Sequence, residues 1–226
     1  MLREHHKVAI YLEGHFSTDY GKMGIGVLRY LSNQIVAVID SKNNGKNTNE
    51  FNSIERSVPI VSTLDAAVLN GAEVLILGIA PSGGKIPEAW FKVIESAISK
   101  NLSIINGLHD TLLSKYKNSL RNNQWIWDVR VPQFVPKIAS GKAAKLKNKR
   151  ILCVGTDMAV GKMTTSLEMH KWAIEKKINS SFIATGQIGI TISGEGIPLD
   201  AYKVDHACGA VEQMILKNQN SDWIFI

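Results

Sequence analysis

The sequence has few of the residues that cross-link small proteins or anchor chains in membranes. It contains two cysteines in 226 residues, Cys153 and Cys208, and neither lies in a CxxC motif or a Cys/His cluster. This pattern argues against a disulfide framework and a structural metal site. The strongly apolar runs, such as Val74–Leu77, are far too short to span a bilayer, and no signal-peptide-like stretch precedes the first expected strand. We therefore expect a cytoplasmic protein with its own hydrophobic core and no membrane partner.

Aromatic residues are also scarce, at 7%, although the net charge is +6. A basic protein invites a nucleic-acid interpretation, but here much of the positive charge lies in one short stretch with few aromatics beside it. A block of like charges is more often a solvated segment than a binding groove. The sequence therefore disfavours a nucleic-acid partner. The residues of this stretch are Lys137, Lys142, Lys145, Lys147, Lys149 and Arg150.

The first half of the chain alternates apolar strands with helical segments. This rhythm predicts an α/β domain over residues 1–130, with a parallel sheet covered by helices on both faces. Asp110 is expected to cap a helix that runs to about Leu120. Strands are expected at Val8–Leu12, Ile35–Ile39, Pro59–Val61, Val74–Ile79 and Leu102–Ile105, and other helices at Met23–Leu31, Thr63–Leu69 and Pro87–Ser99.

A proline- and lysine-containing stretch breaks this rhythm, and we interpret residues 131–149 as a basic linker. A second α/β domain is expected over residues 150–226. Because it has only about 75 residues and stops within an expected strand, we expect it to be incomplete at the C-terminus. Its expected elements are strands Arg150–Val154, Ser181–Thr185 and Trp223–Ile226, helices Lys162–Lys176 and Val204–Lys217, and a Gly-rich loop through Pro198.

The strongest motif is the phosphate-binding loop that joins the first strand and helix of this second domain. Glycines let the backbone wrap an anion so that successive N–H groups point at phosphate oxygens, and the helix start adds unpaired N–H groups. Lys162 supplies a positive charge for the terminal phosphates, so it is also a catalytic candidate. The predicted cofactor-binding residues are Gly155, Thr156, Asp157, Val160, Gly161, Lys162, Met163, Thr164 and Thr165.

Two departures from the common P-loop pattern affect what the loop is expected to bind. Five residues separate Gly155 from Gly161, where the common pattern has four. Met163 occupies the position at which a hydroxyl normally binds Mg²⁺, and Thr164 follows one step later as the predicted metal ligand. Phosphate binding is therefore predicted with or without ATP hydrolysis.

A second polar segment follows the next strand, at the edge of the sheet where ligands bind in parallel sheets. Thr185, Gly186, Gln187 and Gly189 are the predicted substrate-binding residues, with a flexible polar loop as the alternative. Asp205 opens the next helix and is a candidate base, although an acid in a first turn often only compensates the helix dipole.

The first half carries weaker patterns. Gly78–Pro87 repeats the strand–Gly–Gly–Lys order and is either a tight turn or an anion contact. Gly21, Gly24 and Gly26 with Asp40 are in the wrong order for a dinucleotide fingerprint, which makes NAD a weak prediction.

Six segments of the sequence together resemble one bacterial and archaeal family. They are Tyr11–Phe16, Gly78–Lys85, Gly107–Asp110, Ile126–Arg130, Gly155–Thr165 and Thr185–Ile190. The sequence is similar to the two-domain family that includes D-glutamate N-acetyltransferase (DgcN-like), and the loop also resembles that of dethiobiotin synthetase. The resemblance implies a Rossmann-like N-terminal domain and a P-loop NTPase-like C-terminal domain, and it implies further chain after the strand at Trp223–Ile226.

The two resemblances imply two functions, and the phosphate-binding loop leaves a third open. The first is an N-acetyltransferase that uses acetyl-CoA and an acidic D-amino acid such as D-glutamate, with the P-loop holding the phosphates of CoA. The second is an ATP- and Mg²⁺-dependent ligase or kinase of the dethiobiotin-synthetase kind. The third is a non-catalytic nucleotide-binding protein. Each implies a small-molecule ligand, and a homo-oligomer is left open.

Overall fold

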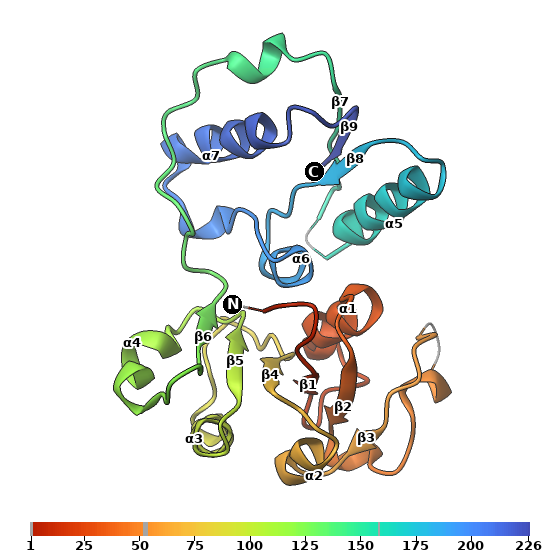
Figure 1. The fold of residues 1–226 in the computed structure, drawn as a ribbon, viewed down its shortest axis with the longest axis vertical. Helices are drawn as coiled ribbons and strands as arrows, with labels where there is room; N and C mark the ends of the chain where they lie inside the picture. Colours follow the sequence, from red (N-terminus) through yellow and green to blue (C-terminus); the bar gives the residue numbers. More distant parts are fainter. Residues whose placement is uncertain (1, 52–53, 158) are drawn as a thin grey trace. The chain divides into compact units, whose positions relative to one another are not determined.

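The computed structural model describes residues 2–51, 54–157 and 159–226. It divides the chain into two compact units, Met1–Arg130 and Val131–Ile226, each built around its own parallel sheet (Figure 1). The predicted α/β class is therefore confirmed. No helix in the described part of the chain is both long enough and apolar enough to cross a bilayer.

The sheet of the first unit has six parallel strands in the order β3-β2-β1-β4-β5-β6. This is the strand order of the Rossmann fold, with the order reversing between β1 and β4. The strands are β1 (Val8–Tyr11), β2 (Ile35–Ile39), β3 (Ile60–Val61), β4 (Val74–Leu77), β5 (Ser103–Asn106) and β6 (Ile126–Asp128). The α-helices are α1 (Lys22–Tyr30), α2 (Leu64–Leu69), α3 (Phe91–Ser99) and α4 (Leu112–Tyr116).

The central strands are apolar along both faces because helices cover the sheet on both sides. Every residue of β1, β2 and β4 is buried, which explains why their sequences lack the alternation of half-exposed strands. Short 3₁₀ helices lie at Asp19–Gly21, Ser41–Asn43, Thr48–Glu50, Glu88–Trp90 and Lys117–Ser119 in this unit, and at Lys142–Lys145 and Leu199–Ala201 in the second.

Strand β6 was not expected from the sequence, and it changes the account of α4. Asp128, buried at the end of β6, accepts hydrogen bonds from the backbone N–H groups of Leu112 and Leu113 at 3.0 and 2.9 Å. The predicted cap, Asp110, instead accepts a 2.7 Å bond from the N–H of Ile86. The helix therefore starts at Leu112 and takes its N-terminal partner from a distant strand.

Asp40 lies at the end of β2, where an acidic residue would bind ribose in a dinucleotide-binding domain. Here it is fully buried, and its carboxylate accepts bonds from the N–H of Gly14 at 3.0 Å, the N–H of Lys42 at 3.3 Å and the side-chain amide of Asn43 at 2.7 Å. Asp40 thus fixes the loop after β1 to the loop after β2. Its carboxylate is therefore engaged within the protein and does not support the weak prediction of NAD binding.

The second unit has three parallel strands in the order β7-β9-β8. They are β7 (Lys149–Ile151), β8 (Ser180–Phe182) and β9 (Trp223–Phe225), and the α-helices are α5 (Lys162–Glu175), α6 (Gln187–Ser193) and α7 (Val204–Lys217). The connections from β7 to β8 and back to β9 place α5 and α7 on opposite faces of the sheet (Figure 1). The core between sheet and α7 contains Ile183, Ile197, Ala210, Met214, Ile215 and Ile224.

The Gly-rich loop expected before Pro198 contains helix α6, so that expectation was wrong for residues 187–193. Gly189 packs closely, because a Cβ there would lie 3.0 Å from the Cβ of Ala184, a tight contact. The close packing of α6 against the end of the preceding segment explains why a glycine-containing sequence is helical here. Gly194, with φ of +79°, ends the helix.

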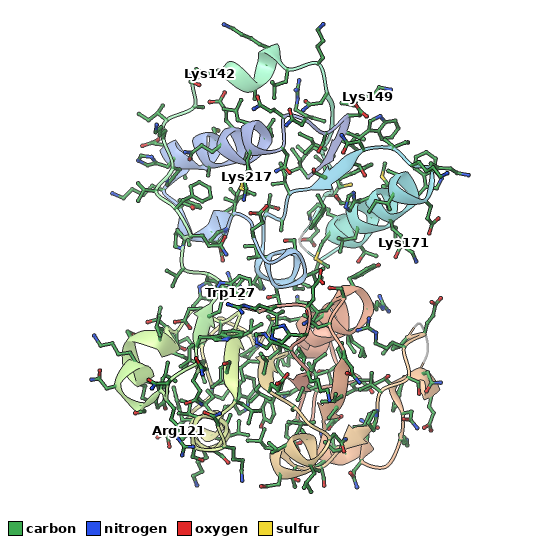
Figure 2. The ribbon with its side chains drawn as sticks, in the orientation of Figure 1. Arg121, Trp127, Lys142, Lys149, Lys171 and Lys217 are labelled. Carbon is green, nitrogen blue, oxygen red and sulfur yellow. The ribbon has the colours of Figure 1, made fainter. Side chains whose placement is uncertain are left out.

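Residues 131–149, interpreted above as a basic linker, are attached to α7 by their backbone. Glu212, on α7, accepts hydrogen bonds from the N–H groups of Ser140 and Ala143, the second at 3.1 Å, and these bonds lower the pKa of its carboxyl. A Cβ on Gly209 would lie 1.6 Å from the carbonyl oxygen of Lys137, so the segment crosses the helix at that glycine. The lysines of the run are exposed, and Lys142 and Lys149 project from separate places on this unit (Figure 2).

Candidate functional site

The candidate phosphate-binding loop leaves β7 after Ile151 and enters α5 at Lys162. Gly161 has φ of +99°, a left-handed conformation that favours glycine, and it occupies the N-cap position of α5 without a capping side chain. A Cβ on Gly155 would lie 2.7 Å from the side chain of Val160, which would have to shift, so glycine lets the loop fold closely on itself. Met158, within this loop, lies outside the described residues.

Lys162 closes over the loop from the first position of the helix. Its Nζ donates a 2.5 Å hydrogen bond to the carbonyl oxygen of Asp157, and its aliphatic chain lies beside Gly155. An anion within the loop would compete with this carbonyl for the same ammonium group. The residues available to hold phosphate are therefore the backbone of the loop, the uncapped start of α5 and this one lysine.

Three consecutive residues near the start of α5 carry hydroxyl groups. Thr164 is half-buried, Thr165 is exposed, and Ser166 is buried with its Oγ lacking a hydrogen-bond partner. Met163 is half-buried beside them. The described residues contain no cluster of three or more His, Cys, Asp or Glu side chains placed to hold a metal ion. Thr164 as the Mg²⁺ ligand stays a prediction.

The predicted substrate segment lies at the same edge of the sheet as the loop, because β7 and β8 are parallel to β9, which separates them. Thr185 and Gly186 precede α6, and Gln187 and Gly189 lie within its first turn. Thr185 accepts a long, 3.5 Å bond from the N–H of Leu199 through its carbonyl oxygen. Gly189 serves packing, which leaves Gln187, half-buried at the helix start, as the side chain of this segment best placed to meet a ligand.

Asp205 lies in the first turn of α7 and is exposed. Sequence reasoning missed its neighbour His206, which lines a groove and whose Nδ1 is buried without a hydrogen-bond partner. A single histidine after an aspartate carries no spacing signal, so only the fold identifies it.

In the first unit, the residues of the weaker Gly–Gly–Lys pattern hold two loops together by hydrogen bonds and close packing. Gly83 and Gly84 have φ of +77° and +64°, and a Cβ on Gly84 would lie 2.2 Å from the ring of His109. The N–H of His109 donates to the carbonyl oxygen of Gly84 at 2.8 Å, and the carboxylate of Asp110 binds the N–H of Ile86. The Gly–Gly turn therefore packs against the loop after β5.

Comparison with known families matches both units in chain order. Residues 41–132 match the Rossmann-like domain of unknown function DUF1611_N, and residues 137–226 match the P-loop domain DUF1611_C. The chain belongs to the DUF1611 family. Its expected two-domain organisation, with a Rossmann-like N-terminal domain and a P-loop C-terminal domain, is thereby confirmed.

Curated relatives include proteins named D-glutamate N-acetyltransferase. The one from Tritonibacter scottomollicae is 39% identical over 167 residues, and the one from a Pseudoalteromonas species is 40% identical over 168 residues. Each match covers 73% of this chain and 50% of the relative, so the chain spans about half the length of those proteins. The resemblance stated from the motifs is confirmed at the level of the family.

A solved structure gives a closer likeness. The crystal structure of a DUF1611 family protein from Anabaena variabilis superposes with a TM-score of 0.93 at 43% sequence identity. The match covers 98% of this chain and 65% of that protein.

Proposed function

We propose that this chain forms the phosphate-holding part of an N-acetyltransferase that transfers acetyl from acetyl-CoA to the amine of an acidic D-amino acid such as D-glutamate. The observation that carries the proposal is a glycine-bounded P-loop closed by Lys162, in a chain 39–40% identical over part of its length to proteins named D-glutamate N-acetyltransferase. The P-loop lacks a hydroxyl at Met163, which fits a loop that holds phosphate without promoting its transfer.

The residues present fit a ligand with a pyrophosphate. Gly155 and Gly161 keep the loop free of side chains where the backbone must approach an anion. Lys162 would exchange the carbonyl of Asp157 for a phosphate oxygen, forming a charge-assisted hydrogen bond in place of a neutral acceptor. Acetyl-CoA, when bound, supplies an activated thioester.

The acceptor amine must lose a proton before it attacks, which requires a base within hydrogen-bond reach. Asp205 is the candidate in this chain because it is exposed at the start of α7, at the same edge of the sheet as the P-loop. Gln187 would orient the acceptor through its amide. We expect Asp205→Asn to lower kcat more than it raises KM, whereas Gln187→Ala should mainly raise KM.

A second candidate function is ATP-dependent phosphoryl transfer. It is favoured by Thr164, half-buried in the first turn of α5, which would bind Mg²⁺ in place of the missing hydroxyl at position 163. In that case Thr164→Val should abolish Mg²⁺-dependent nucleotide binding and leave acetyl-CoA binding unchanged. A purely nucleotide-binding role would show tight binding without turnover.

Calorimetric titration with acetyl-CoA and, separately, with ATP–Mg²⁺ distinguishes these functions. Removing the ammonium group in Lys162→Ala should weaken acetyl-CoA binding by roughly 10- to 100-fold, the value of a charge-assisted hydrogen bond. Lys171→Ala, which removes an exposed lysine on the same helix, is the matched control and should bind like the parent. Binding of ATP–Mg²⁺ alone would refute the acetyltransferase proposal.

A further inference from the structure

The first unit has a cluster of polar side chains that the proposed function does not use. It lies where the strand order reverses, between β1 and β4, which is the point at which open parallel sheets bind ligands. The loop after β1 contributes His15, Thr18 and Tyr20, and the loop after β4 contributes Ser82 and Lys85. The Gly–Gly–Lys pattern of the second loop therefore meets polar side chains from another loop.

Hydrogen bonds hold the two loops in place before any ligand binds. The hydroxyl oxygens of Tyr20 and Ser82 are 3.1 Å apart, and the N–H of Ala80 donates to the carbonyl oxygen of Tyr20 at 2.8 Å. Within the first loop, the N–H of Thr18 donates to the carbonyl oxygen of His15 at 3.1 Å. A site that is already ordered loses little conformational entropy when it binds a ligand.

The hydrogen bonds of His15 determine which of its ring nitrogens a ligand meets. Its Nδ1 lies 3.1 Å from Oγ1 of Thr18, and that hydroxyl donates to the carbonyl oxygen of His15 at 3.3 Å. Because the hydroxyl has one proton and the carbonyl takes it, Nδ1 carries the ring proton of the neutral imidazole and donates it to Thr18. Nε2 is then a lone-pair acceptor. It makes no hydrogen bond to the described residues, and His15 is only half-buried with no enclosed ring nitrogen, so a ligand can reach it.

The Tyr20–Ser82 pair supplies the opposite kind of group. Each hydroxyl has one proton, and the bond between them uses one of the two. Whichever residue donates, the pair keeps one proton for an acceptor on a ligand. Both side chains are exposed, so this donor is accessible. The rings of Tyr20 and His15 have centroids 5.4 Å apart, which places the donor and the acceptor within reach of one small ligand.

An α-amino acid carries the matching groups on a single carbon atom. Its ammonium group donates hydrogen bonds and its carboxylate accepts them, and the two have opposite charges. Each loop also has an exposed charge of the sign that such a ligand needs. Asp19 lies in the loop that holds His15, and Lys85 lies in the loop that holds Ser82.

We propose that this cluster is an amino-acid site of the first unit and that it holds the zwitterionic head group. The α-ammonium group donates to Nε2 of His15, in the loop that carries Asp19. The α-carboxylate accepts the remaining proton of the Tyr20–Ser82 pair, in reach of the charge of Lys85. This site is separate from the P-loop and from the acceptor position proposed at Gln187.

Backbone amide shifts of the isotopically labelled chain test this site during titration with D-glutamate and, separately, with glutarate. Glutarate keeps both carboxylates and lacks the ammonium group. We expect D-glutamate to shift the amides of residues 13–21 and 80–85, with a dissociation constant on the order of 1 mM for a ligand of about ten non-hydrogen atoms. Glutarate should bind roughly fivefold more weakly, because it lacks the hydrogen bond to His15.

Two variants separate the recognition of the two charged groups. His15→Phe keeps a ring beside Tyr20 and removes the acceptor, so the affinity for D-glutamate should fall to that for glutarate, which should change little. Lys85→Ala should weaken the binding of both ligands by about two- to fivefold, the range of an exposed charge interaction. Lys92→Ala removes an exposed lysine of α3 and is the matched control, which should bind like the parent.

Shifts confined to Gln187 and its neighbours would place the amino acid in the second unit and overturn the proposal. Equal affinity of the parent for D-glutamate and glutarate, or an unchanged preference in His15→Phe, would show that the imidazole does not recognise the ammonium group. Because Lys85 is an exposed loop residue, its variant tests the site even if His15→Phe fails to fold. The titrations contain no acetyl-CoA, so their failure is distinct from a failure of the acetyltransferase proposal.

Discussion

Replacing Gly209 by alanine should destabilise the second unit, although the same change stabilises most helices. Gly209 lies inside α7, where an exposed glycine costs about 1 kcal/mol relative to alanine. Here, however, an added Cβ would lie 1.6 Å from the carbonyl oxygen of Lys137, 2.8 Å from its carbonyl carbon and 3.0 Å from the backbone nitrogen of Ala139. All three are backbone atoms, so no side-chain rotation relieves the contact.

The chain at residues 137–139 must therefore move away from the helix by well over an ångström. That movement strains the neighbouring hydrogen bonds of Lys137 to Gln213 and of Ser140 to Glu212. Overpacking of a well-packed site costs about 1–3 kcal/mol, which exceeds the propensity gain. Because all three contacts are with backbone, we expect a cost in the upper part of this range, about 2–3 kcal/mol, and after the propensity gain of about 1 kcal/mol a net loss of about 1–2 kcal/mol in the free energy of unfolding. For a unit of this size, each kcal/mol corresponds to a fall of about 4–8 °C in Tm.

Urea unfolding followed by tryptophan fluorescence measures this loss, because Trp172 and Trp223 both report on the second unit. Cys208→Ala, at the exposed neighbouring position of the same helix, is the control and should change the unfolding free energy by less than about 0.5 kcal/mol. A Gly209→Ala protein that is more stable than the parent would show that residues 131–149 are not packed on α7 as described.

Three further predictions concern single side chains. Gly161→Ala should lower the affinity for a phosphate ligand and cost about 1 kcal/mol or more of stability, because φ of +99° is strained for any residue with a Cβ. Calorimetry measures the affinity and urea unfolding the stability. Unchanged affinity would contradict the loop geometry. Hydrogen bonds from Ser140 and Ala143 lower the pKa of Glu212 below its ordinary 4.5, so the stability that the carboxylate contributes is present above that pH and is lost as the pH falls through the folded pKa. Glu212→Gln should therefore flatten the fall in unfolding free energy on the acid side. An unchanged slope would show that the Glu212 carboxylate is not its source. Burial and the nearby Glu13 raise the pKa of Tyr11 from 10.0 to about 12, so stability from its neutral phenol is present below pH 10 and declines as the pH rises toward 12. The pKa of Tyr116 is raised to about 12 as well, so absorbance titration should show late-ionising tyrosines in the parent and one fewer in Tyr11→Phe, and an unchanged number would contradict the assignment to Tyr11.

The sequence was sufficient to predict the elements whose signals are local. A continuous apolar run predicts a buried strand such as Val74–Leu77, and the Gly161–Lys162 pair predicts the start of α5. Strand β6 was missed because three residues, Ile126–Asp128, are too few to show a period, and because its pairing with β5 is a long-range contact. The capping of α4 by Asp128 was missed for the same reason.

The candidate site also has parts that the sequence could predict and parts that only the fold brings together. The P-loop is a contiguous motif, so its residues could be named in order. The groove beside His206 joins residues 132–136 to residues 201–206, and neither segment has a recognisable spacing. Helix α6 was missed because glycines at positions 186, 189 and 194 read as a loop, although one of them packs the helix and another ends it.

The order of strands in the second unit has a consequence for how the 226-residue chain behaves at high concentration. Within the described residues β7 lies at the end of its sheet, so one row of its backbone groups faces away from β9, and Leu152 and Val154 just beyond it are 63% and 79% exposed. Such an edge is a template for pairing with another chain. The exposed Lys149 and Arg150 on this strand place positive charge on the same edge, where two molecules would repel each other. We expect this repulsion to limit self-association of the 226-residue chain, and added salt should promote association by screening it.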